Sequence, residues 1–363
     1  MTDIMFTESI LSTITCESKI TNINYKKEAD LIKQIIASLD IKIIDTTILT
    51  GGDEKTRFDI IILNTDKGIL KIPNTTGNTN KELIQEYSDL VENGVKNKLI
   101  TDNIIRIGCN YGEFISNEYI ELNKPKKKSN RGRKKKVKEP SNRKQIGNAR
   151  YFNSQITFSI LDDDKCYHLK LFTNGRVQVP FVSNENVEII SPIIYKIIDL
   201  VSIYKDVKVN DIDECNIEYI KSIMRNYKFN INDEELFLDL NKFQRLVANF
   251  KHYYENNKKI LDKNFDIGEI DKTLYDSQWE ELTKLPISLI KHSSERYVGF
   301  ILKFFTPTDN NKKKQSTVKI FSSGKFNLDG CNSKEEAEKI KNILNIIVKI
   351  GYKYIIYKKI KYD

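Results

Sequence analysis

The sequence predicts an α+β fold built from two similar halves, each an antiparallel sheet covered on one side by helices. The first observation is a gapless internal match between residues 169–181, LKLFTNGRVQVPF, and residues 318–330, VKIFSSGKFNLDG. The second is a long run with apolar residues at helical spacing after each of these segments. The third is that strand-like stretches precede both segments. One unit that occurs twice in a chain of 363 residues predicts a pseudo-symmetric architecture.

Each matched segment is typical of a β-hairpin. The triplets TNG at 173–175 and SSG at 322–324 each separate two runs in which apolar and polar residues alternate. Glycine in the third place suits a three-residue turn, because that position needs a positive φ. We therefore expect a strand, a tight turn and a second strand in each segment.

A long helix is expected after each hairpin. In residues 333–352, Ser333 and Glu336 fit a capping box, and the apolar residues that follow recur at helical spacing. The corresponding run, residues 184–204, contains Pro192. A proline either kinks a helix or occupies its first turn, so both arrangements are open at this position.

The repeat extends upstream of the hairpins. Residues 149–158 and 295–304 are strand-like, as are the opening stretches 8–18 and 221–231, and helix candidates follow these at Tyr25–Leu39 and Asp239–Tyr254. The expected unit is therefore strand, helix, strands, hairpin and long helix. We expect a first repeat over 1–205 with an insertion at 40–150, and a second repeat over 206–363 with a smaller insertion at 255–285.

Alternation along the strands places one phenylalanine of each hairpin outside the core, because strand side chains point to alternate faces. The buried faces should hold Leu169, Leu171, Val177 and Val179 in one hairpin and Val318, Ile320, Phe326 and Leu328 in the other. The opposite faces should hold Phe172 with His168, Lys170, Arg176 and Gln178, and Phe321 with Thr317, Lys319, Lys325 and Asn327. The same alternation puts Tyr151 and Tyr297 on these outward faces. An aromatic residue at the same outward place in both halves indicates a binding surface.

A second interpretation of the outward phenylalanines stays open. The insertion at 40–150 is large enough to pack on the outward face of the first half. In that case the aromatic side chain would cover a neighbouring part of its own chain.

Positive charge is concentrated in one segment. The chain has a net charge of +9, and residues 124–150 contain thirteen Lys/Arg and one acid, so the remainder of the chain sums to −3. Arg131-Gly132-Arg133 resembles the core of an AT-hook, which inserts arginine into narrow A·T minor grooves. Nonspecific contact with DNA and a nuclear-import signal are both compatible with this loop. Its central basic residues are Lys126, Lys127, Lys128, Arg131, Arg133, Lys134, Lys135 and Lys136.

Several classes of protein are disfavoured by composition. The five cysteines are far apart and form no CxxC pair, which argues against a disulfide framework or a zinc module and favours an intracellular protein. No apolar run approaches the roughly 20 residues of a membrane span, and the N-terminus lacks the basic flank of a signal peptide. The three histidines are scattered, and no catalytic constellation stands out. We expect no cofactor, no metal, no membrane association and no enzymatic activity.

The two hairpins carry a family resemblance. FSSGK, with an apolar strand before it and a strand, a glycine and a long helix after it, resembles the TATA-binding protein family, and FTNGR is the same element in the other half. The resemblance covers 1–38 with 104–205, and 215–255 with 286–357. The basic loop before RYFNSQITF resembles the divergent versions of large cytoplasmic DNA viruses. What the resemblance implies is a saddle, in which a curved antiparallel sheet has its helices on the convex side.

The resemblance also implies roles for particular residues. In the family the concave face lies in the DNA minor groove, and aromatic wedges separate base steps. Carried over by position, the wedges are Phe172, Phe321, Tyr297 and Tyr151, with Phe152 as the alternative to Tyr151. The implied DNA contacts are Ser9, Ser222, Lys170, Arg176, Gln178, Lys303, Lys319, Lys325 and Asn327. The chain departs from the family pattern in four places: Ser9 and Ser222 replace asparagines, and Pro180 and Asp329 replace threonines.

The function implied is that of a general transcription initiation factor. It would bind AT-rich double-stranded DNA as a monomer, bend the promoter and recruit an RNA polymerase or other transcription factors. The alternative is a saddle-shaped protein–protein adaptor of a transcription or virion complex that contacts DNA only through the basic loop. Either protein would work inside the cell, in a viral factory in the host cytoplasm, in a virion or in the nucleus.

Overall fold

The computed structural model forms two compact units. It describes residues 6–51, 58–74, 78–124, 154–162, 165–204, 214–255, 271–283, 287–293, 297–306 and 314–358. Unit 1 contains residues 1–15, 183–185 and 222–363, and unit 2 contains residues 16–182 and 186–221. The division at residue 205 that the repeats suggest is therefore not the division into units. The reason is that strands β1 (Ile10–Ile20) and β10 (Ile217–Asn230) each contribute one end to unit 1 and the other end to unit 2.

In unit 1 an antiparallel sheet carries its helices on one face. The strand order is β12-β13-β14-β15-β10, and all the pairs are antiparallel. The remaining elements of this unit are β11 (Leu236–Leu238), α7 (Leu240–Glu255), α8 (Lys272–Ser277), α9 (Trp279–Thr283), β12 (Ile287–Ser293), β13 (Tyr297–Thr306), β14 (Lys314–Ile320), β15 (Lys325–Cys331), α10 (Lys334–Ile350), α11 (Tyr352–Ile355) and β16 (Ile356–Lys358). Helices α8 and α9 lie in the small insertion expected at 255–285.

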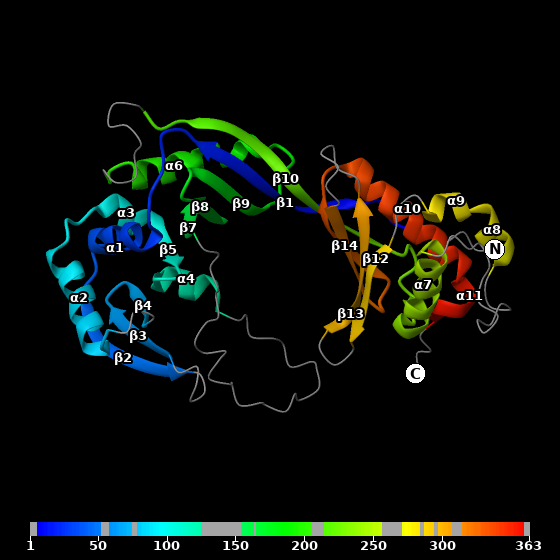
Figure 1. Ribbon diagram of the computed structural model, residues 1–363, viewed down its shortest axis with the longest axis horizontal. Coiled ribbons are helices and arrows are strands. Elements are labelled where there is room, and N and C mark those ends of the chain that lie inside the picture. The colour runs from blue at the N-terminus through cyan, green and yellow to red at the C-terminus, as the bar shows by residue number, and fades with distance from the viewer. Residues whose placement is uncertain are drawn as a thin grey trace. The chain divides into compact units, whose positions relative to one another are not determined.

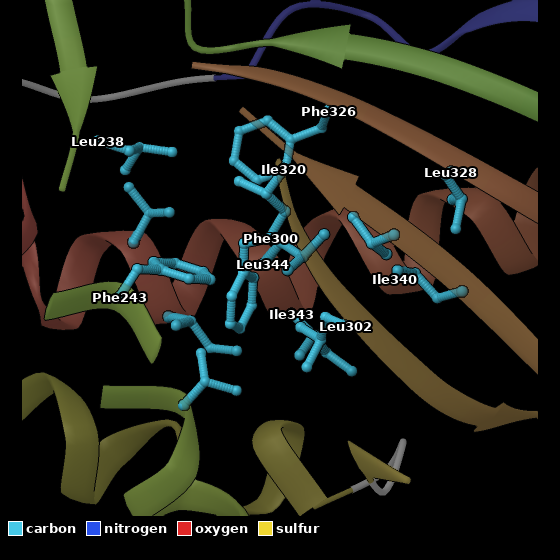
Figure 2. Close-up of a cluster of buried hydrophobic side chains, with 14 of the residues drawn as sticks. Leu238, Phe243, Phe300, Leu302, Ile320, Phe326, Leu328, Ile340, Ile343 and Leu344 are labelled. Carbon is cyan, nitrogen blue, oxygen red and sulfur yellow. The ribbon is translucent and has the colours of Figure 1, made fainter. Parts of the chain in front are cut away.

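The core of unit 1 lies between the sheet and the helices α7 and α10. Figure 2 shows Phe300, Ile320 and Phe326 of the strands close to Phe243 of α7 and Leu344 of α10. All five side chains are fully buried. Each such side chain stabilises the fold by about 1.5–3 kcal/mol relative to an exposed one, so this layer holds the hairpin rigidly from behind.

Unit 2 has a longer sheet. Its strand order is β2-β3-β4-β6-β5-β7-β8-β9-β1-β10. Its other elements are α1 (Glu28–Ser38), β2 (Ile43–Gly51), β3 (Phe58–Thr65), β4 (Gly68–Asn74), α2 (Asn80–Asn93), α3 (Lys98–Asn103), β5 (Ile104–Cys109), β6 (Gly112–Ser116), α4 (Asn117–Leu122), β7 (Gln155–Asp162), β8 (Lys165–Phe172), β9 (Arg176–Val182), the 3-10 helix η1 (Val187–Ile190) and α6 (Ser191–Val201). The described part of residues 40–150 contains five strands, β2 to β6 (Figure 1). Strand β5 pairs with β7 as β12 pairs with β13 in unit 1, so β5 belongs to the repeat and the other four strands lengthen the sheet.

The expected helices are present, with two refinements at their ends. Pro192 lies in the first turn of α6, which resolves the two arrangements left open by the sequence. The Ser333 hydroxyl accepts a hydrogen bond from the Glu336 amide and so caps α10. The Glu336 carboxylate, however, accepts from the Asn332 amide and the Ser316 hydroxyl rather than closing a capping box on Ser333.

The two hairpin turns have the same geometry. Gly175 has a φ of 76° and Gly324 a φ of 73°, as expected for the third residue of each turn. The Gly175 amide donates to the Phe172 carbonyl at 3.0 Å, and the Gly324 amide donates to the Phe321 carbonyl at 3.0 Å. The α+β class and the two-repeat organisation are thus confirmed in the backbone.

The opening strands join the two turns in the same way. Ile20 of β1 donates its amide to the Gly175 carbonyl, and Ile231, directly after β10, donates its amide to the Gly324 carbonyl, both at 2.9 Å. Ile20 and Ile231 are therefore corresponding residues of the two repeats. All five cysteines are free, and no helix in the part of the chain that the structure describes is long and apolar enough to cross a membrane.

Candidate nucleic-acid interface

The alternation expected in the hairpins is confirmed. The side chains expected on the core faces are completely buried: Leu169, Leu171, Val177 and Val179 in unit 2, and Val318, Ile320, Phe326 and Leu328 in unit 1. Phe172 and Phe321 lie on the opposite faces and are half-buried. Each unit therefore presents an outward face with one phenylalanine beside its turn, and we call these the unit 1 face and the unit 2 face.

The unit 2 face has a shallow open pocket beside Phe172. The pocket has a volume of about 220 Å³ and is lined by Ser154, Phe172, Thr173, Asn174, Arg176 and Gln178. Gln155 of β7 is directly opposite Phe172 of β8, and Lys170 is opposite Gln178 of β9. The register thus places the expected contacts Lys170, Arg176 and Gln178 together around one turn.

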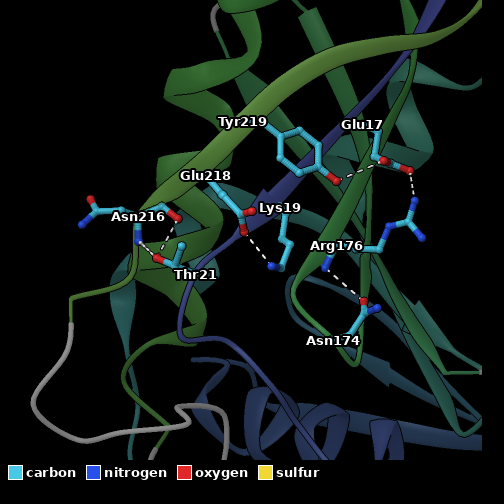
Figure 3. A network of polar contacts seen from close by, with 8 residues as sticks. All are labelled: Glu17, Lys19, Thr21, Asn174, Arg176, Asn216, Glu218 and Tyr219. Carbon is cyan, nitrogen blue, oxygen red and sulfur yellow. Dashed lines mark hydrogen bonds and ion pairs between the residues drawn. The ribbon is translucent and has the colours of Figure 1, made fainter.

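A buried carboxylate holds Arg176 on this face. Glu17 of β1 is 3% exposed and forms ion pairs with Arg176 and Lys221. The Tyr219 hydroxyl donates a hydrogen bond to Glu17 at 3.1 Å. Figure 3 shows the arginine of β9 and the tyrosine of β10 approaching Glu17 from opposite sides. A second ion pair, between Lys19 and Glu218, lies beside this cluster at 2.6 Å.

Glu17 is therefore held in its charged form. Burial raises the pKa of Glu17, but hydrogen bonds from Arg176, Lys221 and Tyr219 outweigh that effect, so the net shift of the pKa is downward. An ionised carboxylate between two cations cancels one of their two charges. Arg176 is thus already engaged by an acid of its own chain.

The unit 1 face is different in its charged groups. Asp329, which stands where a threonine was expected, forms an ion pair with Lys319 at 2.5 Å. Towards the turn, Asn327 is opposite Lys228 of β10, and Lys325 is opposite Asn230. The side chains of Lys228, Asn230, Lys325 and Asn327 are exposed.

A short helix of the insertion covers part of the unit 2 face. Tyr119 of α4 packs edge-on against His168 of β8, with ring centroids 6.3 Å apart, and the Arg106 guanidinium lies over the Tyr119 ring at 5.4 Å. The Arg106 side chain is also paired with Glu113 at 2.6 Å. His168 shares its face with Phe172, so α4 lies on the outward side of the sheet. The interpretation in which the insertion packs on this face is therefore correct for the end of the face near His168.

Polar groups under this cover are satisfied within the chain. The Ser159 hydroxyl is 2.8 Å from Nδ1 of His168 and is completely buried. Burial lowers the pKa of His168, and the charge of Arg106 lowers it further. His168 is therefore neutral at pH 7. Within the described residues no group of three His, Cys, Asp or Glu side chains could hold a metal ion.

One of the expected contacts, Ser9, is buried. Ser9 is 6% exposed, because it shares its strand parity with Leu11, which packs against the core of unit 1. Its hydroxyl cannot reach a ligand on the outward face. Ser222 is half-buried in β10, and Lys303 is half-buried in β13, on the unit 1 face opposite Thr317.

The other expected positions are only partly within the described residues. Tyr151 and the basic loop, including Lys126 to Lys136, lie outside them. Tyr297 begins β13, but its side chain is also outside the description. Their roles stay predictions.

Sequence reasoning missed three groups on the outward faces: Glu17, Lys221 and Lys228. The signal was available for Glu17 and Lys228, since each lies three residues before Ile20 or Ile231 at the end of an opening strand. The expected alignment paired residues 8–18 with 221–231. The hydrogen bonds of Ile20 and Ile231 shift that correspondence by two residues.

Comparison with curated proteins identifies relatives of the chain. No model of a known protein family matches it. A protein of a South African tick isolate of African swine fever virus, named "Putative TATA-binding protein pB263R", is 29% identical over 263 residues, which cover 71% of this chain and 81% of the relative. The protein of the same name from a Malawi tick isolate is 29% identical over 268 residues, covering 72% and 83%.

The chain is therefore similar to viral proteins that are named as TATA-binding proteins. Among solved structures, the Methanococcus jannaschii TBP is similar over 53% of this chain and 80% of its own, with 17% identity and a TM-score of 0.29. The chain differs from a plain repeat of two halves in its insertion, which adds β2, β3, β4, β6 and α4 to unit 2.

Proposed function

We propose that the chain is a transcription initiation factor that binds and bends AT-rich double-stranded DNA through the minor groove. The observation that carries the proposal is the pair of outward phenylalanines, Phe172 and Phe321, at corresponding positions of two turns with the same hydrogen bonds. The name of the viral relatives supports the same function. Recruitment of an RNA polymerase would follow from a role in initiation.

The chemistry of the two faces suits a minor groove. Apolar side chains at the tip of a sheet can enter a base step and unstack it, at a cost of a few kcal/mol that added contacts offset. Amide side chains such as Gln178 and Asn327 can donate to the acceptors N3 of adenine and O2 of thymine. Lysines such as Lys325 can contact the phosphates on either side.

Bending is the direct test of the wedge assignment. Replacing both Phe172 and Phe321 with alanine should abolish bending of an AT-rich duplex, measured by fluorescence transfer between its two ends. Tyr195→Ala is a matched control, since Tyr195 is 45% exposed on α6 and lies outside the outward faces. Unchanged bending in the double variant, with the control also unchanged, would refute the wedge role.

Two observations favour the adaptor function as a second candidate. Helix α4 covers the unit 2 face near His168, and Glu17 neutralises charge beside Arg176. An adaptor would contact DNA only through the basic loop. Loss of every trace of duplex affinity when this loop is deleted would support the adaptor.

A further inference from the structure

The two outward faces differ in charge at one pair of corresponding positions. Ile20 and Ile231 make the same hydrogen bond to the glycine of their turn, so Glu17 and Lys228, each three residues earlier, occupy the same place in the two repeats. Arg176 and Lys325, each directly after the turn glycine, also correspond. In unit 2 the carboxylate of Glu17 lies beside the guanidinium of Arg176. At the corresponding positions of unit 1 there are two cations, Lys228 and Lys325.

On the unit 2 face the cations are held by the chain itself. Glu17 is 4% exposed in its side chain, whereas Arg176 and Lys221, which pair with it, are 48% and 56% exposed. The carboxylate lies beneath the two cations. An incoming anion would have to compete with an acid that is already in place and desolvated.

On the unit 1 face two lysines project together. The register pairs Lys228 with Asn327 and Lys325 with Asn230, so the lysines are diagonal neighbours with Cβ atoms about 7–8 Å apart. All four side chains are exposed. Acids on and around this face have partners of their own: Asp329 pairs with Lys319, and Glu8 pairs with Lys334.

We propose that Lys228 and Lys325 form a binding site for the phosphates of a nucleic acid backbone, and that Glu17 closes the corresponding site in unit 2. The site takes two phosphate groups, with Asn230 and Asn327 as neutral donors beside them. A duplex held by phosphates at one repeat and not at the other is bound in one orientation. This inference rests on the proposed function, because it assumes that the outward faces meet DNA.

The salt dependence of binding measures the site. Each phosphate neutralised contributes about 0.9 to the slope of log K against log salt concentration. In the full-length chain, the double variant Lys228→Gln with Lys325→Gln should flatten the slope by about 1.8. When the salt concentration is lowered from 200 to 50 mM, the affinity of this variant should therefore rise about 12-fold less than that of the wild type. The matched pair Arg176→Gln with Lys221→Gln should flatten the slope less, by at most about 0.9, because Glu17 already cancels one of their two charges.

Glu17→Gln tests the closed site. Freeing Arg176 and Lys221 should tighten duplex binding at low salt and steepen the slope by about 0.9–1.8. Adding Arg176→Gln and Lys221→Gln to Glu17→Gln should cancel that gain. Thermal unfolding gives the melting temperature of each variant. A variant whose melting temperature lies above the temperature of the binding assay is folded during that assay.

Three outcomes are informative. Equal flattening by the two lysine and arginine pairs, or an unchanged slope in Glu17→Gln, overturns the inference. Unchanged bending in the phenylalanine variants while the slope differences persist overturns only the wedge function. Absence of all duplex binding by the full-length chain overturns both.

Discussion

At the scale of single residues, one aromatic side chain stands where the other repeat has glycine. Phe181 has a φ of 65°, and Gly330, its counterpart in the second hairpin, has a φ of 88°. The end of β9 therefore needs a left-handed conformation that glycine adopts freely and a phenylalanine adopts at a cost of about 1–3 kcal/mol. Phe181 is 71% exposed, so burial does not offset the strain.

Replacing Phe181 with glycine should stabilise unit 2. The expected gain is about 1 kcal/mol relative to Phe181→Ala, because alanine keeps the Cβ that makes a positive φ unfavourable. The midpoint of urea unfolding, followed by circular dichroism, compares the two variants. A glycine variant no more stable than the alanine variant would show that the backbone relaxes without strain.

At the scale of elements, α4 is the helix of unit 2 that covers part of the unit 2 face. The helix has six residues and is capped by Ser116, whose hydroxyl accepts a hydrogen bond from the Tyr119 amide at 3.2 Å. Such a short helix has less than two turns of periodic pattern, so the sequence offers little to predict it from. Its position over His168 depends on contacts between residues that are far apart along the chain.

Removing the Tyr119 ring should raise the pKa of His168 towards its ordinary value. Burial is the larger cause that lowers this pKa, and the Tyr119→Ala variant would expose the imidazole. Because the folded pKa is depressed, wild-type stability should fall as the pH drops below about 6.5, and it should fall less in the variant. NMR titration of the His168 ring is the measurement, with Tyr195→Ala as the control. An unchanged titration would mean that α4 does not shield His168.

Strand alternation and the turn glycines predicted most elements of the repeat. The orientation of individual side chains on β1 depended on tertiary packing. The outward Phe172 and Phe321 follow from strand parity and a turn glycine, both of which are local. The orientation of Ser9 does not follow from local patterns, because β1 meets the core of unit 1 at Leu11 and is buried in unit 2 at Cys16 and Ile20. The alternation of apolar and polar residues along a strand does not determine which neighbouring element the strand packs against. The pairing of Glu17 with Arg176, separated by 159 residues, likewise depends on the folded sheet.

At the scale of the whole molecule, charge is divided between a loop and a body. Residues 124–150 carry a net charge of +12, and the rest of the chain carries −3. Long-range attraction to a polyanion therefore belongs to the loop, while the outward faces supply the shape and the short-range contacts.

Deleting residues 124–144 should weaken duplex binding strongly without abolishing it. The deletion removes twelve Lys/Arg and one acid, so the slope of log K against log salt concentration should flatten by several units. Binding titrations over a salt series on AT-rich and GC-rich duplexes measure the remainder. A residual preference for the AT-rich duplex supports the proposed function, whereas no residual affinity supports the adaptor.

The division of β1 and β10 between the two units has a consequence for the order in which the units fold during synthesis. Residues 16–221 contain all of unit 2, so this unit can fold while the ribosome is still translating. Unit 1 needs residues 222–363, which take roughly 7–28 s more at about 5–20 residues per second. Phe6, whose ring lies 5.2 Å from Phe229 and 4.9 Å from Phe326, is synthesised before both of these partners and must wait for them. During that interval the N-terminal segment is an unpaired strand on a nascent chain, and it needs protection from other chains.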